Sequence, residues 1–87
     1  MDIRTELLAR AKTKQFNNDC MVFENPRRIA FLLRNTLCEY LDEQKIPYRT
    51  FFDSTVDYDG CYVQLFILSW IENEKIEQLH FHFYKTI

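Results

Sequence analysis

Two segments in the first half of the chain carry apolar residues at helical spacing, and each is predicted to form an α-helix. The first runs from Asp2 to Gln15, with a one-sided apolar stripe made by Ile3, Leu7, Leu8 and Ala11. The second runs from Pro26 to about Gln44. Asn25 suits the N-cap of this helix, and Pro26 costs no hydrogen bond at the first helical position.

Two smaller apolar features leave alternatives open. Phe31 and Cys38 fall almost opposite the broad apolar face of the second helix, so either the first helix covers them or another molecule does. The short run Cys20–Phe23 between the two helices is consistent with an edge strand or with a loop packed inward.

From Pro47 onward the apolar period changes from that of a helix to that of a strand. The alternation predicts strands at Tyr48–Val56, Cys61–Ile71 and Lys75–Lys85, and the turn between the first two contains the single glycine, Gly60. The middle strand is almost continuously apolar, which indicates a central position. The predicted fold class is therefore α+β: two N-terminal helices followed by a three-stranded antiparallel β-meander, in a single domain over residues 1–87.

Alternation also assigns side chains to the two faces of the predicted sheet. The aliphatic side of the central strand, together with Phe52, Phe81 and Phe83, is expected to support the second helix. A first helix of about 14 residues spans only about 21 Å, so we expect it to leave the other face partly open. The alternative is that the first helix crosses to this face and buries it. The partner-binding residues expected on the open face are Phe51, Tyr62, Phe66, Trp70, His80, His82 and Tyr84.

Charge is distributed unevenly along the chain. Of the 87 residues, 47% are hydrophobic and the net charge is −2, but residues 1–34 carry +3 and residues 35–87 carry −5. The acids expected to surround the open sheet face are Asp53, Asp57, Asp59, Glu72, Glu74 and Glu77. A second, basic candidate surface for nucleic acid comprises Arg10, Lys14, Arg27, Arg28 and Arg34.

The sequence offers little catalytic or metal-binding machinery. His80 and His82 share a strand face, but Cys61 is expected on the opposite face, so we predict no metal and no cofactor. The turn around Asp57 resembles part of a calcium loop but lacks the later bidentate Glu. One glycine cannot make a phosphate loop, and no nucleophile motif is present.

Three cysteines without a CxxC pair, and an N-terminus without the layout of a signal peptide, predict reduced thiols in a cytoplasmic protein. No stretch is apolar enough to span a membrane.

These observations favour a non-enzymatic protein-interaction module, with a second copy or another protein as its partner. The small, glycine-poor and aromatic-rich chain is similar in style to the accessory proteins with which phages and mobile elements block host enzymes. The alternatives are a nucleic-acid-binding protein and a small toxin-like ribonuclease using Arg49, His80 and His82.

Overall fold

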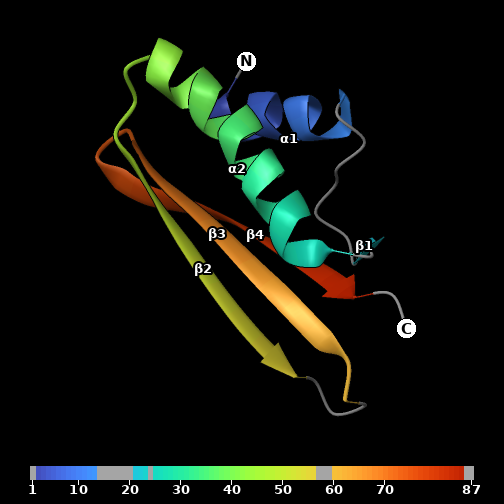
Figure 1. Cartoon of the computed structure of the whole chain (residues 1–87). Helices are drawn as coiled ribbons and strands as arrows, with labels where there is room; N and C mark the ends of the chain where they lie inside the picture. Colours follow the sequence, from blue (N-terminus) through green and yellow to red (C-terminus); the bar gives the residue numbers. More distant parts are fainter. Residues whose placement is uncertain (1, 14–20, 24, 57–59, 86–87) are drawn as a thin grey trace.

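The computed structural model describes residues 2–13, 21–23, 25–56 and 60–85, and within them it contains two helices and four strands (Figure 1). The elements are α1 (Ile3–Thr13), β1 (Met21–Phe23), α2 (Pro26–Glu43), β2 (Tyr48–Val56), β3 (Tyr62–Glu72) and β4 (Lys75–Lys85). The predicted α+β class, with an antiparallel meander after the helices, is confirmed. The bounds of β2 and β4 are those predicted, β3 is shifted by one residue, and α2 ends one residue early. The part of the first helix predicted at residues 14–15 lies outside the described residues.

The sheet has the strand order β1-β4-β3-β2. The pairs β2–β3 and β3–β4 are antiparallel, and β3 is central in the meander, as predicted. Met21–Phe23 forms a short edge strand parallel to β4, which confirms the edge-strand alternative for these three residues; Cys20 lies outside the described residues. The two edges of the sheet are therefore the three-residue β1 and the nine-residue β2.

Side-chain caps and turn residues define where the elements begin. The Asn25 side chain accepts a hydrogen bond from the Arg28 N–H at 3.2 Å and caps α2. Asp2 Oδ1 accepts one from the Thr5 N–H at 2.7 Å. Hydrogen bonds from the Thr5 side chain and then from its backbone lower the pKa of Asp2. Asn73 and Glu74 connect β3 to β4 with φ of 52° and 65°, and positive φ at both central residues is the signature of a type I′ turn.

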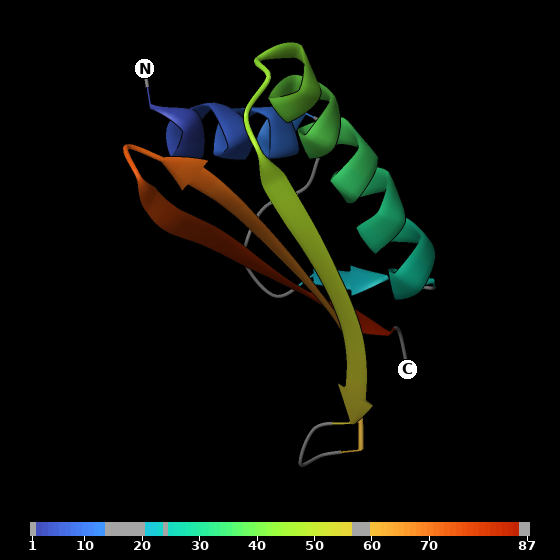
Figure 2. The ribbon, with the colours of Figure 1, turned by 90° about the vertical axis from the view of Figure 1, so that its left-hand side faces the viewer.

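Both helices lie on the same side of the sheet (Figure 2). Leu7 and Ala11 of α1 are fully buried in the same core cluster as Trp70 and Phe81, and Arg4 bonds Glu77 of β4 at 3.0 Å. The first helix therefore does not cross to the second sheet face. The fold is a helical layer over one face of the sheet, and no described residue outside the sheet covers the opposite face.

The prediction of which side of β3 lies under α2 was wrong, whereas Phe52, Phe81 and Phe83 lie on the helix-covered face as predicted. Pairing places Phe52 opposite Phe66 and Phe66 opposite Phe81, so the aromatic residues of three strands share the helix-covered face. Together with Phe31 of α2 they form a four-ring stack, with centroid separations of 4.5, 5.0 and 5.8 Å. The aliphatic side of β3, with Leu65 and Ile67, lies on the uncovered face. A one-residue change of register moves every side chain of a strand to the other face, and the sequence analysis had joined the faces of neighbouring strands incorrectly.

The back of α2 also differs from the prediction, because its two apolar residues contact β2. Phe31 stacks on Phe52, and the buried Cys38 thiol hydrogen-bonds the Tyr48 side chain. Both contacts are made by β2, which neither alternative had named. They place the first half of β2, up to Phe52, beside α2, whereas residues 53–56 are exposed.

Candidate functional site

The outer face of the sheet, the face opposite the two helices, has no covering element among the described residues. Cross-strand pairing defines its membership. It consists of Arg49, Phe51, Asp53 and Thr55 from β2, Val63, Leu65, Ile67, Ser69 and Ile71 from β3, and Ile76, Gln78, His80, His82 and Tyr84 from β4.

Large apolar side chains on this face are exposed. Ile76 is 73% exposed, Phe51 54% and Ile71 51%. Ile71 and Ile76 are directly paired at the hairpin end of β3 and β4, and Ile67 lies between Phe51 and His80. Val63, between Thr55 and Tyr84, is buried, so the exposure is concentrated in the middle and hairpin end of the sheet. Such a group of exposed apolar side chains is typical of an interaction surface.

Polar groups surround these apolar side chains. Arg49 and Asp53 stand two residues before and after Phe51 on the same face. His80 Nε2 lies 3.0 Å from Gln78 Oε1, and Gln78 Nε2 donates to Ser69 Oγ at 3.2 Å. The outer face thus combines apolar anchors with hydrogen-bonding groups, which is the composition of a protein interface.

A shallow hollow of about 520 Å³ lies beside the start of β2, next to the hairpin that joins β3 and β4. Its walls include Pro47, Arg49, Ile71 and Ile76. The two exposed isoleucines therefore border a depression that a side chain of a partner can enter.

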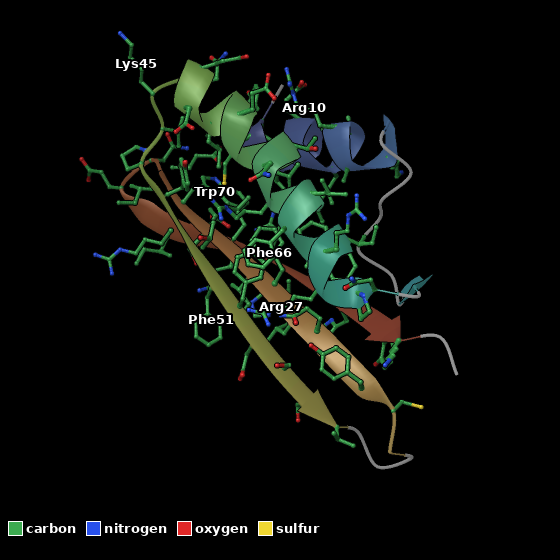
Figure 3. The ribbon with its side chains drawn as sticks, viewed as in Figure 1. Arg10, Arg27, Lys45, Phe51, Phe66 and Trp70 are labelled. Carbon is green, nitrogen blue, oxygen red and sulfur yellow. The ribbon has the colours of Figure 1, made fainter. Side chains whose placement is uncertain are left out.

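The seven predicted partner-binding residues are split between the two faces of the sheet. Phe51, His80, His82 and Tyr84 lie on the outer face, as the prediction requires. Phe66 and Trp70 are 0% and 1% exposed beneath the helices, so their predicted exposure was wrong (Figure 3). Tyr62 also lies on the helix-covered side, and its hydroxyl donates to Gln64 Oε1 at 2.8 Å.

Ile71 and Ile76, which are paired and both exposed on the outer face, were not among the predicted partner-binding residues. The sequence did indicate that Ile76 is exposed. Side chains an even number of residues apart lie on the same face of a strand, so Ile76 shares a face with Gln78, His80 and His82, and a face with these polar residues is expected to face solvent. The two-residue turn after Glu72 then places Ile71 opposite Ile76 on the same face.

The expected acidic rim is not on the outer face. Glu77 is paired with Arg4 on the helix-covered side, and Glu72 Oε1 accepts a hydrogen bond from Trp70 Nε1 at 3.0 Å. Asp57 and Asp59 lie outside the described residues. Glu74 lies in the turn between β3 and β4. Of the four predicted rim acids that the structure describes, Asp53 lies on the outer face, where it accompanies Arg49.

The predicted basic surface is divided as well. Arg10 bonds Glu6 at 3.0 Å and lies 4.5 Å over the Tyr40 ring, far from Arg27 (Figure 3). Arg34 is half-buried and hydrogen-bonds Cys38, and Lys14 lies outside the described residues.

Arg27 and Arg28 do come together with a third cation that was not predicted. They and Lys85 line a hollow of about 640 Å³ at the start of α2.

The described residues show no assembled catalytic or metal centre. They contain no group of three or more His, Cys, Asp or Glu side chains placed to hold a metal ion. Burial raises the pKa of the Cys38 thiol, which disfavours the nucleophilic thiolate. His80 and Arg49 share the outer face but lie on β4 and β2, with β3 between them, so roughly 10 Å separates their backbones.

Comparisons of the chain with protein-family models, with curated proteins and with solved structures found no match. Among the described residues, no helix has the length and apolar character needed to cross a membrane.

Proposed function

We propose that this protein is a non-enzymatic interaction module that binds one partner protein through the outer face of its sheet. The observation that carries the proposal is the exposure of Ile76, Ile71 and Phe51 on a face that neither helix covers. Both α1 and α2 are used to bury the opposite face, so this apolar surface is available to another molecule.

The contacts of the outer face favour a protein over a small molecule as its ligand. The hollow beside Ile71 and Ile76 is shallow, and the apolar side chains extend across three strands rather than converging on one cavity. Hydrogen-bonding groups of Gln78 and His80 lie beside the apolar residues, as at the border of a protein interface.

Affinity capture from an extract of the cells that produce the protein tests this proposal. The binding variant carries Ile71→Asp with Ile76→Asp. The matched control is Leu32→Asp, which places the same carboxylate on a 45% exposed apolar residue of α2. We expect one protein to be retained in about equal amount by the wild type and the control and lost from the double variant. Equal retention by all three forms, or no retained protein, contradicts the proposal.

We extend this proposal to inhibition: the partner is an enzyme whose surface the small protein occupies. Its support is the absence from the sequence of the catalytic motifs considered above, together with the small size of the chain. The captured protein, once identified, is assayed with increasing amounts of the wild type. Inhibition that is complete at about one equivalent supports this extension, and unchanged activity contradicts it.

A second candidate function, binding to a phosphate backbone, is favoured by the hollow that Arg27, Arg28 and Lys85 line. Three cations around one hollow attract phosphate, and the attraction weakens with salt. Arg27→Glu with Arg28→Glu is expected to abolish any retention of RNA or DNA in a gel-shift assay at low salt. If the wild type itself retains neither nucleic acid, this candidate is excluded.

A further inference from the structure

The long edge of the sheet, strand β2, lacks the usual protection against pairing with another strand. No described strand lies beyond β2 (Figure 1), and Figure 2 shows it in front of the rest of the sheet. Its nine residues contain no Pro, Gly or Lys, and nine successive one-to-one pairs with β3 show that it has no bulge. Its two charged residues, Arg49 and Asp53, have opposite signs, so they do not repel an equivalent strand as charges of one sign would. Natural proteins use these devices to prevent edge-to-edge association, so their absence makes β2 a template for a further strand.

The main-chain groups that face outward from β2 follow from its pairing with β3. The Ile71 N–H donates to the Pro47 carbonyl at 3.2 Å, so every second residue from Pro47 onward turns its main chain toward β3. The main-chain N–H and C=O groups of Thr50, Phe52 and Ser54 therefore point away from β3, toward the open edge of the sheet. The Ser54 N–H agrees with this, since it donates to the Asp53 side chain at 2.8 Å and not to β3.

The side chains of β2 are complementary to those of the same strand in a second copy. Arg49 and Asp53 lie on the outer face at equal spacing from Phe51. In an antiparallel pair with a twofold axis at Phe51, Arg49 of each copy faces Asp53 of the other, and the two Phe51 rings face each other. Opposite charges and aromatic rings at directly paired positions both stabilise a sheet.

The direction of the main-chain groups selects the same register. With the axis at Phe51, Thr50 of one copy is opposite Phe52 of the other, and both turn their N–H and C=O groups toward the partner. Moving the axis by one residue, to Thr50 or to Phe52, leaves Arg49 opposite a residue other than Asp53. The register that satisfies the charges is therefore one that also satisfies the backbone.

We propose that two copies of this chain associate through antiparallel pairing of their β2 strands about a twofold axis at Phe51, forming one continuous eight-stranded sheet. The Asp53–Ser54 hydrogen bond gives way to the Arg49 contact of the second copy. Phe31, which is 37% exposed and stacks on Phe52, lies beside the same edge on the helical side and gains cover there. The pairing joins the outer faces of both copies into one wider surface.

Exchanging the charges at positions 49 and 53 tests the proposal. Sedimentation equilibrium measures the molecular mass of each variant in solution across a range of protein concentrations. The wild type is expected to be a dimer. Arg49→Asp alone and Asp53→Arg alone each place like charges opposite each other, and each is expected to raise the dissociation constant about tenfold or more. The double variant Arg49→Asp with Asp53→Arg restores opposite charges and should dimerise like the wild type.

A mixture of the two single variants distinguishes this register from a general charge effect. One copy then presents two carboxylates and the other two cations, so the mixture is expected to form a heterodimer that neither variant forms alone. A wild-type monomer at all concentrations overturns the proposal, as does a mixture no more associated than its components. Neither result bears on partner binding at Ile71 and Ile76, which lie outside the proposed contact.

A cysteine cross-link then checks the position of the axis. In a background carrying Cys20→Ser and Cys61→Ser, Phe51→Cys places two thiols at the axis, within the range of about 4.4–6.8 Å between Cα atoms that a disulfide needs. Thr55→Cys, on the same face of the same strand, is the matched control and should remain largely uncross-linked. Equal cross-linking of both variants overturns the proposed register.

Discussion

Phe51 and Phe52 are neighbours in the chain and lie on opposite faces of β2. Phe52 stacks between Phe31 and Phe66 beneath α2, at 4.5 and 5.0 Å between ring centroids. Phe51 stands on the outer face and is 54% exposed. This one pair separates the side chains that hold the fold together from those available to a partner.

Truncation of the two phenylalanines is therefore expected to have different effects. Phe52→Ala removes a ring from the middle of the stack and should lower the free energy of unfolding by about 2–4 kcal/mol. When both truncations are made in the Arg49→Asp background, which weakens the proposed pairing of β2 strands, Phe51→Ala should change it by no more than about 0.5 kcal/mol, because the ring is largely in water in the single chain. Urea denaturation of both variants measures the difference. Equal losses of stability would contradict the assignment of faces.

Trp70 is expected to act as a core residue. It is 1% exposed, its indole N–H donates to Glu72, and the Arg4 guanidinium lies 5.4 Å from its ring. Trp70→Ala should cost about 3–5 kcal/mol, a large part of the stability of a small domain. Ile76→Ala, at a 73% exposed position, is the control and should leave thermal unfolding nearly unchanged. A folded, undestabilised Trp70→Ala variant would be inconsistent with this core.

The contact between α2 and the start of β2 predicts a loss of stability at alkaline pH. A hydrogen bond to the Asp42 carboxylate, with smaller contributions from burial and Cys38, raises the pKa of Tyr48 from 10.0 to about 12. Burial raises the pKa of Cys38 above its ordinary value of 9.0. The folded state favours the protonated forms of Tyr48 and Cys38. Their contribution to the free energy of unfolding is therefore complete below about pH 9 and is lost as the pH rises toward about 12.

Urea midpoints measured between pH 8 and pH 12 check this dependence. Tyr48→Phe should be less stable than the wild type at pH 8 and should lose less stability as the pH rises, because one of the titrating groups is gone. Parallel slopes for the wild type and Tyr48→Phe would contradict the role given to Tyr48.

The turn between β3 and β4 holds a glutamate in a conformation that favours glycine. Glu74 has φ of 65°, and a side chain in the left-handed region costs about 1 kcal/mol or more. Glu74→Gly is expected to raise the free energy of unfolding by about 0.5–1 kcal/mol, since Asn-Gly is the preferred sequence of this turn. Thermal unfolding measures the gain, and a lower transition temperature would contradict the turn geometry.

Local features of the sequence were sufficient to predict the elements. Asn25 and Pro26 mark the start of α2 through an N-cap and the fixed φ of proline. Apolar or aromatic residues recur at even spacing in the two strands, at Tyr48, Phe52 and Val56 and at Leu79, Phe81 and Phe83. These signals act within one segment of the chain. They need no information about neighbouring elements.

The faces were harder to predict because they depend on contacts between segments. Phe66 and Trp70 were assigned to the open face since alternation within β3 cannot tell which of its two apolar sides meets the helices. The decisive information is the pairing of Phe52, Phe66 and Phe81, which follows from the lengths of the turns. This pairing also changes the membership of the candidate site. Phe51, His80, His82 and Tyr84 lie on the predicted face, whereas Ile71 and Ile76 take the place of the buried Phe66 and Trp70.

Hydroxyl-radical footprinting, of the chain alone and with its captured partner, tests the central claim most directly. In the free protein, Ile71 and Ile76 should be oxidised readily, whereas Trp70 and Phe66 should react little. In the complex, Ile71 and Ile76 should become protected, while Leu32 on the helical side stays reactive. Rapid oxidation of Trp70 in the free protein, or protection of Leu32 with Ile76 unchanged, would contradict an interface on the outer face of the sheet.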